Sequence, residues 1–317
     1  MNSFPSNPRI AVVGSGALGC YYGGRLVQHG HDVHFLMRSD FDHVHAHGLH
    51  IQSHAGDFDL APDQLRVYRD PANMPPADLV IVTLKATANH AFPSLISPLL
   101  ADHTAILTLQ NGLGNEQQLA DLFGQQRIIG GLAFACINRI APGQILHTDY
   151  GLIKIGEFGR PPSPRLQTIA QLFQGSNIPC EILADLNAGR WEKLIWNVPF
   201  NALGAALNVT TDRLINNPAG QTLVRQIMEE VIAIAHADGV NLDPALIDKN
   251  INRSLTMGPY RTSMQMDRQN HRPIELQSIL GQPLQVARTH ALATPHIQML
   301  YQLLATQIRS LQDPVIE

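Results

Sequence analysis

The segment GSGALG, residues 14–19, restricts the possible folds of this chain more than any other feature. It follows the short apolar run RIAVV at 9–13 and precedes CYYGGRLVQHG, a predicted helix that ends at Gly30. A second predicted strand, DVHFLM, comes next. A strand, a glycine-rich turn, a helix and a strand within about 30 residues form the βαβ unit that binds dinucleotides. The sequence therefore predicts a Rossmann-type domain in this part of the chain.

Each glycine of this turn has a separate role in the predicted unit. Gly14 permits the tight turn, Gly16 lets a pyrophosphate approach the backbone, and Gly19 allows the helix to pack closely on the strand. The phosphates then lie at the helix N-terminus, where free N–H groups and the helix dipole favour negative charge. The residues expected to contact the cofactor here are Gly14, Ser15, Gly16, Ala17, Leu18 and Gly19.

The residue after the second strand indicates which dinucleotide is bound. Enzymes that use NAD usually place Asp or Glu about 20 residues past the glycines, where it bonds the ribose 2′-hydroxyl. This chain has Arg38 at that place, and a guanidinium pairs well with a 2′-phosphate. NADPH is therefore the expected cofactor. Two alternatives stay open: Arg38 is an ordinary exposed arginine, or Asp40 reaches the ribose.

Polar residues follow two further predicted strands, at 78–84 and 104–109. Ligands bind beyond the carboxyl ends of strands in open α/β sheets, so Lys85 and Asn111 are expected close to the nicotinamide. Three short strands then follow at close spacing, which favours antiparallel strands at the edge of the sheet. They are predicted at 127–137, 144–148 and 151–157, ahead of a helix near 165–174.

From about Asn187 onward the strand signals stop and the chain reads as helical. Residues 220–238 carry apolar side chains at helical spacing. Further helices are predicted at 243–257, 273–290 and 294–312. The fold class is thus α/β, with an NADP-binding Rossmann-type domain at 1–186 and an all-helical domain for substrate binding and dimerisation at 187–317. A cleft between two domains is a preferred place for a ligand.

The stretch WEKLIWNVPFN, residues 191–201, carries the strongest sign of a second site. In a helix, Lys193, Asn197 and Asn201 are four residues apart and share one face. Polar groups on so apolar a segment need a polar partner, since an unpaired buried amide or ammonium is costly. A small ligand with a carbonyl and several oxygens fits that face. The alternative is a lysine that reaches water while the amides bond the backbone.

Composition excludes several classes of partner. The net charge of −4 and the pI near 6.4 give no reason to expect nucleic acid or an anionic membrane. Three scattered cysteines favour a reduced, cytoplasmic setting, and no apolar run is long enough to span a membrane. Five histidines fall between His43 and His54, but that window holds no cysteine or carboxylate ligand, so no metal site is expected.

Four segments together resemble the 2-dehydropantoate 2-reductase (ketopantoate reductase) family. They are GSGALG at 14–19, VTLKA at 82–86 with QNGLG at 110–114, WEKLIWNVPFN at 191–201, and SMQMDRQNHRPIE at 263–275. The resemblance spans nearly the whole chain. It implies NADPH-dependent reduction of ketopantoate to pantoate in pantothenate and coenzyme A biosynthesis. It also implies a Rossmann domain with a helical C-terminal domain, and a homodimer.

The resemblance also implies roles for residues at matching positions. Lys193 corresponds to the family's catalytic lysine, and an ammonium there can stabilise and protonate the oxygen that becomes charged when hydride reaches a ketone carbon. Lys85 and Asn111 match positions near the nicotinamide and the reacting carbonyl, and Arg38 matches the residue beside the 2′-phosphate. The substrate-binding residues implied are Asn111, Asn197, Asn201, Ser263 and Glu275.

This chain departs from the family pattern at several positions around the substrate. Tyr260 stands where many members have a small polar residue, with Arg261 beside it, and Gln277 replaces a common aspartate. Pro199 lies inside the predicted Lys193 helix and removes the N–H that would bond the carbonyl of Ile195, so a kink is expected. These departures concern which 2-keto acid is preferred. Arg261 fits either an additional substrate carboxylate or a surface salt bridge.

Three functions are compatible with these motifs. The first is ketopantoate reduction, and the second is NADPH-dependent reduction of another 2-keto acid on the same catalytic frame. The third is a non-catalytic NADPH sensor, because a fold by itself does not establish function. A sensor has no need of Lys193, Asn197 and Glu275 in register, so it ranks last.

Overall fold

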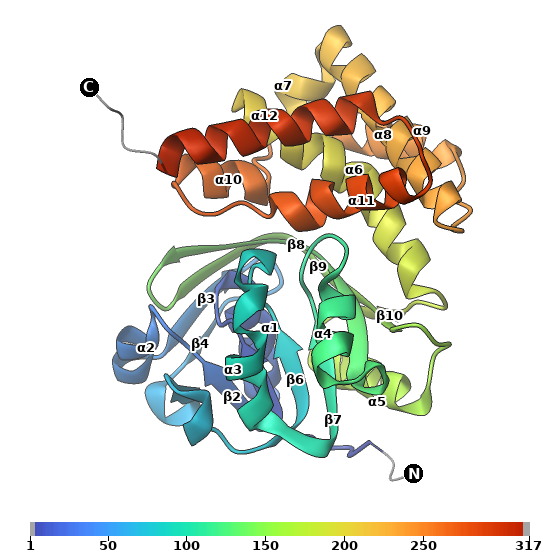
Figure 1. Ribbon diagram of the computed structural model, residues 1–317. Coiled ribbons are helices and arrows are strands. Elements are labelled where there is room, and N and C mark those ends of the chain that lie inside the picture. The colour runs from blue at the N-terminus through green and yellow to red at the C-terminus, as the bar shows by residue number, and fades with distance from the viewer. Residues whose placement is uncertain (1–3, 313–317) are drawn as a thin grey trace. The chain divides into compact units, whose positions relative to one another are not determined.

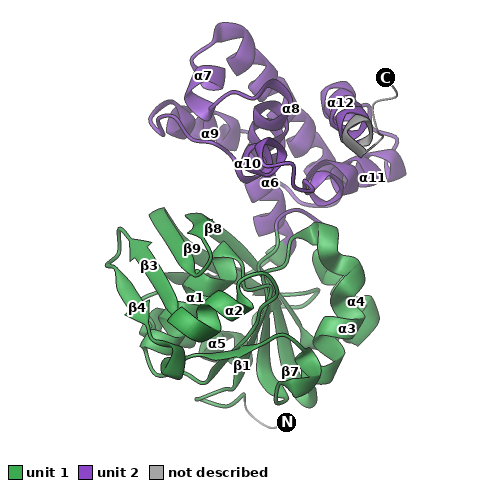
Figure 2. Cartoon of the chain, turned by 90° about the vertical axis from the view of Figure 1, so that its left-hand side faces the viewer, with its two compact units in different colours: residues 1–110, 115–186 green, residues 111–114, 187–317 purple. Residues whose placement is uncertain are grey.

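The computed structural model describes residues 4–312 (Figure 1). By its contacts the chain divides into two compact units, which Figure 2 colours separately. Unit 1 comprises residues 1–110 and 115–186, and unit 2 comprises residues 111–114 and 187–317. The short segment 111–114 therefore belongs with the helical unit, although a strand of unit 1 precedes it in sequence.

Unit 1 is built on one mixed ten-stranded sheet, in the order β4-β3-β9-β8-β7-β6-β1-β2-β5, with β10 also paired to β9. The run from β5 to β8 is parallel, as a Rossmann-type domain requires. This confirms the predicted α/β class. The strands are β1 (Ile10–Val13), β2 (Val33–Leu36), β3 (Leu49–Ser53), β4 (Phe58–Leu60), β5 (Arg66–Tyr68), β6 (Ala77–Val82), β7 (Leu100–Thr108), β8 (Ile128–Ala141), β9 (Gln144–Glu157) and β10 (Cys180–Ile182).

The prediction of three short edge strands is wrong. The structure has two long strands, β8 and β9, which pair antiparallel. The expected turn near Gly151 is instead a bulge, because Phe134 pairs with Leu152 and Ala135 with Tyr150, which leaves Gly151 unpaired. Nor is β9 an edge strand. On the side away from β8, the first part of β9 pairs with β3 and the last part pairs with β10. The long strand therefore pairs with two short strands on that side.

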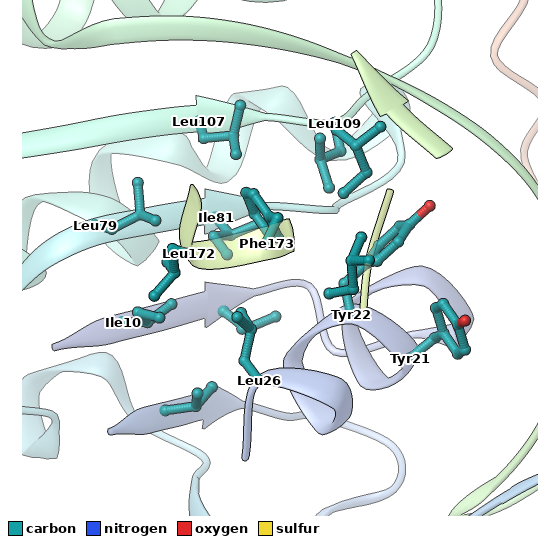
Figure 3. Packing of buried hydrophobic residues seen from close by; sticks show 14 of the residues in the cluster. Ile10, Tyr21, Tyr22, Leu26, Leu79, Ile81, Leu107, Leu109, Leu172 and Phe173 are labelled. Atoms are coloured by element: carbon teal, nitrogen blue, oxygen red, sulfur yellow. The ribbon is translucent and has the colours of Figure 1, made fainter. Parts of the chain in front are cut away.

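Helices cover both faces of this sheet, so its strands are apolar on both sides. Ile10 belongs to the core that contains residues of α1 and α5. Ala11 belongs to the core that contains residues of α3 and α4. Figure 3 shows Leu26 of α1 and Phe173 of α5 among the strand side chains of the first core. The helices are α1 (Ala17–Gln28), α2 (Phe41–His47), α3 (Phe92–Ile96), α4 (Asn115–Phe123) and α5 (Pro164–Gly175).

Unit 2 is helical, and its longest helix, α6, carries the predicted polar face. Trp191, Ile195 and Phe200 of α6 are fully buried in its core, and the helix continues through Pro199. Helices predicted at 220–238, 243–257 and 294–312 are present. The helices are α6 (Leu186–Leu207), α7 (Thr211–Ile215), α8 (Pro218–Ala237), α9 (Ala245–Leu255), α10 (Ser263–Gln269), α11 (Gln282–Thr289) and α12 (Pro295–Gln312). Among the helices described, none combines the length and the apolar character of a membrane span.

The single helix predicted at 273–290 is only partly correct. Regular α-helix is confined to α11, and a π turn at Gln277–Gly281 comes before it. In this turn the N–H of Gln282 donates to the carbonyl of Gln277, one residue further back than in an α-helix. Pro283, which follows, has no N–H to donate. The π turn therefore comes directly before Pro283, the residue that would have interrupted the hydrogen bonding of an α-helix.

A buried histidine in the sheet makes the stability of unit 1 depend on pH. His147 of β9 is 1% exposed, and its Nδ1 is 2.9 Å from the Ser53 hydroxyl. Within the described chain its Nε2 is buried without a hydrogen-bond partner. Burial, and next the neighbouring His54, lower the pKa of His147 to about 4. The native state therefore holds this imidazole neutral.

The free energy of unfolding should decrease as the pH falls from about 6.5 to about 4. In that range the unfolded chain binds a proton at His147 that the native state excludes, and one proton is worth at most about 1.4 kcal/mol per pH unit. Urea unfolding of the wild type and of His147→Gln across this range measures the effect. The variant should show a shallower dependence, and His45→Gln, at an exposed histidine, should keep the wild-type slope. Equal slopes for all three proteins would contradict the assignment.

Candidate functional site

The glycine turn of unit 1 has the shape that a pyrophosphate requires. Gly14 adopts a φ of +100°, and a Cβ there would lie 2.5 Å from the backbone nitrogen of Leu84. A Cβ at Gly19 would lie 2.6 Å from the Thr83 hydroxyl oxygen, so helix α1 approaches the sheet too closely for any side chain. At Gly16, by contrast, a Cβ would meet only one atom, at 4.0 Å. The first and third glycines are thus required for packing, and the second leaves open space over the backbone.

This open space lies at the start of α1, where the first N–H groups of a helix have no partner within it. The Thr83 hydroxyl donates to the carbonyl oxygen of Gly14 at 2.7 Å and holds the turn against the end of β6. Backbone donors, the helix dipole and free space at Gly16 together suit a diphosphate. The residues present therefore fit the predicted dinucleotide.

The turn after β2 contains the residues expected to distinguish NADPH from NADH. Arg38 is exposed there, as an arginine that meets a ligand phosphate must be. Asp40 is 4% exposed, and its carboxylate accepts hydrogen bonds from the Ser39 hydroxyl at 2.8 Å and the Gly143 N–H at 3.3 Å. It also forms an ion pair with Arg139. The burial of Asp40 and its partners within the protein favour Arg38 over Asp40 as the residue that meets the ribose.

Sequence reasoning missed Arg139, which lies 99 residues from Asp40. It lay between the predicted strands at 127–137 and 144–148, and nothing in the sequence there shows that it belongs to β8 or which turn it reaches. Lys85 lies three residues beyond β6 and is exposed, at the carboxyl end of the parallel strands where it was expected. An amide network was also missed, in which Gln110 donates to Asn89 at 2.7 Å and Asn89 donates to Asn115 at 2.9 Å.

The predicted polar face of α6 is present in unit 2. Asn197 and Asn201 are 7% and 4% exposed, and the Asn201 amide nitrogen donates to the carbonyl of Asn197 at 3.0 Å. One turn earlier, the Lys193 ammonium donates to the side-chain oxygen of Asn111 at 2.9 Å. The structure therefore brings together two residues that the sequence had predicted for the site, although they are 82 positions apart.

Asn111 owes its position to the π turn. The Leu113 N–H donates to the carbonyl oxygen of Ser278 at 2.9 Å. In the register of the π turn that carbonyl would bond residue 283, which is Pro283 and has no N–H. Gly112 adopts a φ of +85°, and a Cβ there would overlap the same Ser278 oxygen. Because Pro283 has no N–H, the Ser278 carbonyl oxygen remains available to the loop that carries Asn111. Gly112 lets this loop approach that oxygen.

The pKa of the Lys193 ammonium is lowered to about 7. Burial, and next the positive charge of Arg190, cause this lowering, whereas the carboxylate of Glu275 acts to raise the pKa. A lysine with this pKa holds and releases its proton readily at neutral pH. The perturbation is of the kind found at catalytic residues, and its geometric counterpart is the hydrogen bond to Asn111.

Two other predicted substrate residues lie at the starts of helical segments in unit 2. Ser263 is the first residue of α10, and the next residue, Met264, directs its N–H to the side-chain oxygen of Asn201 at 3.5 Å. Glu275 is 5% exposed and immediately precedes the helical residues that lead into the π turn. Its charge acts on Lys193. The α6 face, the Asn111 loop and the start of α10 thus converge within this unit.

The departures from the family pattern have different structural settings. The Tyr260 ring lies 6.3 Å from the Trp196 ring, and its backbone carbonyl accepts the Thr211 N–H at 3.0 Å. Gln277 instead accepts a hydrogen bond from the Tyr301 hydroxyl of α12 at 3.2 Å, so it contributes to helix packing. Arg261 is exposed. Tyr260 is therefore the departure with an aromatic neighbour on α6, the helix of Lys193.

Comparisons with known proteins match nearly the whole chain to one family. The family model described as "Ketopantoate reductase PanE/ApbA" matches residues 10–160, and its C-terminal counterpart matches residues 185–307. A 2-dehydropantoate 2-reductase from Nostoc sp. is 43% identical over 298 residues, which cover 92% of this chain and 93% of the relative.

Solved structures give the same result. The 2-dehydropantoate 2-reductase of Geobacter metallireducens is 43% identical, with a TM-score of 0.92 over 94% of this chain and 99% of that protein. That of Methylococcus capsulatus is 31% identical, with a TM-score of 0.88 over 97% and 99% of the two chains. A D-mandelate dehydrogenase in ternary complex with NADH and anilino(oxo)acetate is 22% identical, with a TM-score of 0.88 over 96% and 100%. At that identity the likeness shows a shared fold.

Replacing Gly112 by Ala should displace Asn111 and lower turnover. Gly239 provides a matched control, since its φ of +83° is close to that of Gly112 but nothing lies within 4 Å of its Cβ position. Both variants should lose roughly 1 kcal/mol of stability from the positive φ. Only Gly112→Ala should lose more than this, with a lower kcat, because it alone meets the Ser278 carbonyl. Urea unfolding and steady-state kinetics measure the two effects, and equal losses in both variants would refute the proposed loop contact.

Proposed function

The chain belongs to the ketopantoate reductase PanE/ApbA family, and on that premise we propose that it reduces 2-dehydropantoate (ketopantoate) to pantoate with NADPH. This reaction places it in pantothenate and coenzyme A biosynthesis. The observation that carries the proposal is the hydrogen bond of 2.9 Å from the Lys193 ammonium to Asn111. A lysine whose pKa is lowered to about 7, bonded to a second residue of the predicted substrate site, supports its assignment as the proton donor.

NADPH is held by the glycine turn and by the residues after β2. Gly14, Gly16 and Gly19 shape the turn for the pyrophosphate, and Arg38 is available to the 2′-phosphate. When bound, NADPH supplies the hydride that reduces the keto carbon. Lys85 and Asn111 are assigned to the nicotinamide end of the cofactor, as the family resemblance implies.

Lys193 acts as the general acid. As the keto carbon is reduced, negative charge develops on its oxygen, and an alkoxide is too basic to accumulate at pH 7. The Lys193 ammonium stabilises that charge and donates a proton from Nζ to the oxygen, so that a hydroxyl forms and a neutral amine remains. Asn111 accepts one N–H of the ammonium and thereby orients the others. The amine then takes a proton from water, which a pKa of about 7 permits.

The remaining polar residues orient the substrate. Asn197 and Asn201 present uncharged amides, which bind a hydroxyl or carboxylate without adding charge that would oppose the arrival of hydride. Glu275 accepts a hydrogen bond from a substrate hydroxyl, but it repels a carboxylate. Ser263 or backbone donors therefore hold the carboxylate of the substrate.

Reduction of a different 2-keto acid is the second candidate, and Tyr260 favours it. Its ring lies 6.3 Å from the Trp196 ring on the Lys193 helix, where an aromatic residue replaces a small polar one and changes the apolar surface beside α6. A spectrophotometric assay of NADPH oxidation with ketopantoate, other branched 2-keto acids and oxaloacetate separates the two candidates. If NADPH binds tightly and no keto acid is reduced, a non-catalytic sensor becomes the better interpretation.

We further propose that the protein acts in the cytoplasm as a homodimer. The three cysteines are buried thiols outside any disulfide, which suits a reducing compartment. A structural relative, 22% identical, is described as a dimeric ketopantoate reductase from Staphylococcus aureus. Light scattering coupled to size-exclusion chromatography measures the mass directly, and a monomer over the working concentration range would contradict the dimer.

Lys193→Ala should lower kcat roughly 10²- to 10⁴-fold, the usual worth of a positioned general acid. Binding of NADPH, followed by its fluorescence, should be retained because the substitution leaves the glycine turn and Arg38 intact. Lys249→Ala removes an exposed lysine from the same unit and should leave kcat unchanged. Near-wild-type turnover of Lys193→Ala would exclude Lys193 as the general acid.

The rate of keto-acid reduction should fall as the pH rises through about 7, because the ammonium form of Lys193 is the proton donor. Asn111→Asp places a negative charge 2.9 Å from Nζ, which favours the ammonium and raises the pKa of Lys193. The alkaline limb of the kcat profile should therefore move to higher pH in this variant. A limb that stays in place, or moves to lower pH, would show that another group controls it.

A further inference from the structure

A second arginine, Arg139 of β8, reaches the turn that follows β2. Its Nη1 donates to the Ser39 hydroxyl oxygen at 3.0 Å and forms the ion pair with Asp40. The backbone of the β8–β9 turn joins the same cluster, because the Gly143 N–H donates to Asp40 at 3.3 Å. Two distant segments of unit 1 therefore meet at the place where Arg38 is exposed.

The charges in this cluster leave an excess of positive charge. Asp40 is buried and pairs with Arg139, so that its negative charge is compensated. Arg38 adds a second guanidinium at the surface. Arg38, Asp40 and Arg139 together carry one net positive charge. The exposed Ser39 hydroxyl lies beside them. Such a site suits a phosphate group, which guanidinium groups bind with charge-assisted hydrogen bonds.

Arg139 has donors to spare for such an anion. Its side chain is 40% exposed, and Nη1 is the atom that contacts Ser39 and Asp40. Within residues 4–312, the Nε and Nη2 atoms of Arg139 donate no hydrogen bond. Asp40 therefore holds one edge of the guanidinium, and the other donors remain for a ligand.

The cluster also lies close to the glycine turn. Cys20 follows Gly19 in sequence, and burial raises the pKa of its thiol to about 12. The charge of Asp40 adds to that rise, and the charge of Arg139 opposes it. Both charges therefore act on the thiol of Cys20, in the first turn of α1. An adenosine ribose bound between the glycine turn and Arg38 would lie in this part of unit 1.

We propose that Arg139 is a specificity-determining residue that binds the 2′-phosphate of NADPH together with Arg38, while Asp40 anchors its guanidinium. The inference rests on the proposed function only in taking NADPH as the cofactor. NADH has no 2′-phosphate and gains nothing from this contact. The competing interpretation is that Arg139 serves only to neutralise the buried Asp40.

The test is binding of NADPH and NADH to the full-length protein, measured by calorimetry. Arg139→Met should raise the Kd for NADPH roughly 10- to 100-fold, the worth of a hydrogen bond to a charged group, and leave the Kd for NADH nearly unchanged. Arg66→Met is the matched control. Arg66 is 57% exposed and pairs with Asp32, which immediately precedes β2, so its removal should leave both Kd values unchanged.

A second variant separates binding from folding, because Arg139→Met leaves Asp40 buried without its partner. In Asp40→Asn/Arg139→Met both charges of the ion pair are removed, so the net charge of the cluster stays the same as in the wild type. The double variant, like Arg139→Met, should bind NADPH and NADH with similar Kd values. In competition with NADPH, 2′,5′-ADP should bind no more tightly than 5′-AMP. A wild-type ratio of the two Kd values in the double variant would overturn the proposal, as would equal weakening of NADPH and NADH.

The binding measurements need no keto acid. A result that contradicts the role of Arg139 can therefore be distinguished from a result that contradicts the proposed function. A wild-type protein that prefers NADPH through Arg139 but reduces no keto acid would support this inference and refute the catalytic proposal. A wild-type protein without preference for NADPH would contradict this inference, whatever its activity with ketopantoate.

Discussion

A buried ammonium that requires a polar partner is the interaction on which the site in unit 2 depends. Lys193 lies on a helix that otherwise buries large apolar side chains, and Asn111 supplies an oxygen 2.9 Å from its Nζ. Asn111 can do so because its loop is bonded to Ser278, at a carbonyl that Pro283 leaves without a helical donor. The pKa of Lys193, the loop contact and the π turn are thus parts of one arrangement.

Unit 1 satisfies a buried charge by the same principle. Asp40 is withdrawn from the surface and paired with Arg139, so the turn after β2 presents positive rather than negative charge. An exposed aspartate at this turn would favour the ribose hydroxyl of NADH. In the proposed arrangement, the hydrogen bonds and ion pair of Asp40 bear on cofactor choice by positioning Arg139. This differs from the glycine turn, where the shape of the backbone alone provides the fit.

Irregular backbone has a specific use in each unit. The bulge at Gly151 lets β9 stay paired with β8 while its opposite side serves two short strands. The π turn at Gln277–Gly281 replaces an α-helical turn where Pro283 would have broken the ladder, and it frees a carbonyl for the Asn111 loop. The sequence predicted neither irregularity, since a turn was expected near Gly151 and one continuous helix at 273–290.

The sequence by itself determined the glycine turn, the two-part fold class and the shared face of Lys193, Asn197 and Asn201. These depend on neighbours within a few residues, and the periods of helix and strand encode such neighbours. Only the tertiary structure decided that Asn111 meets Lys193 across 82 positions and that Asp40 meets Arg139 across 99. Contacts of this kind follow from strand order and from which backbone groups remain unpaired, and no local period records either.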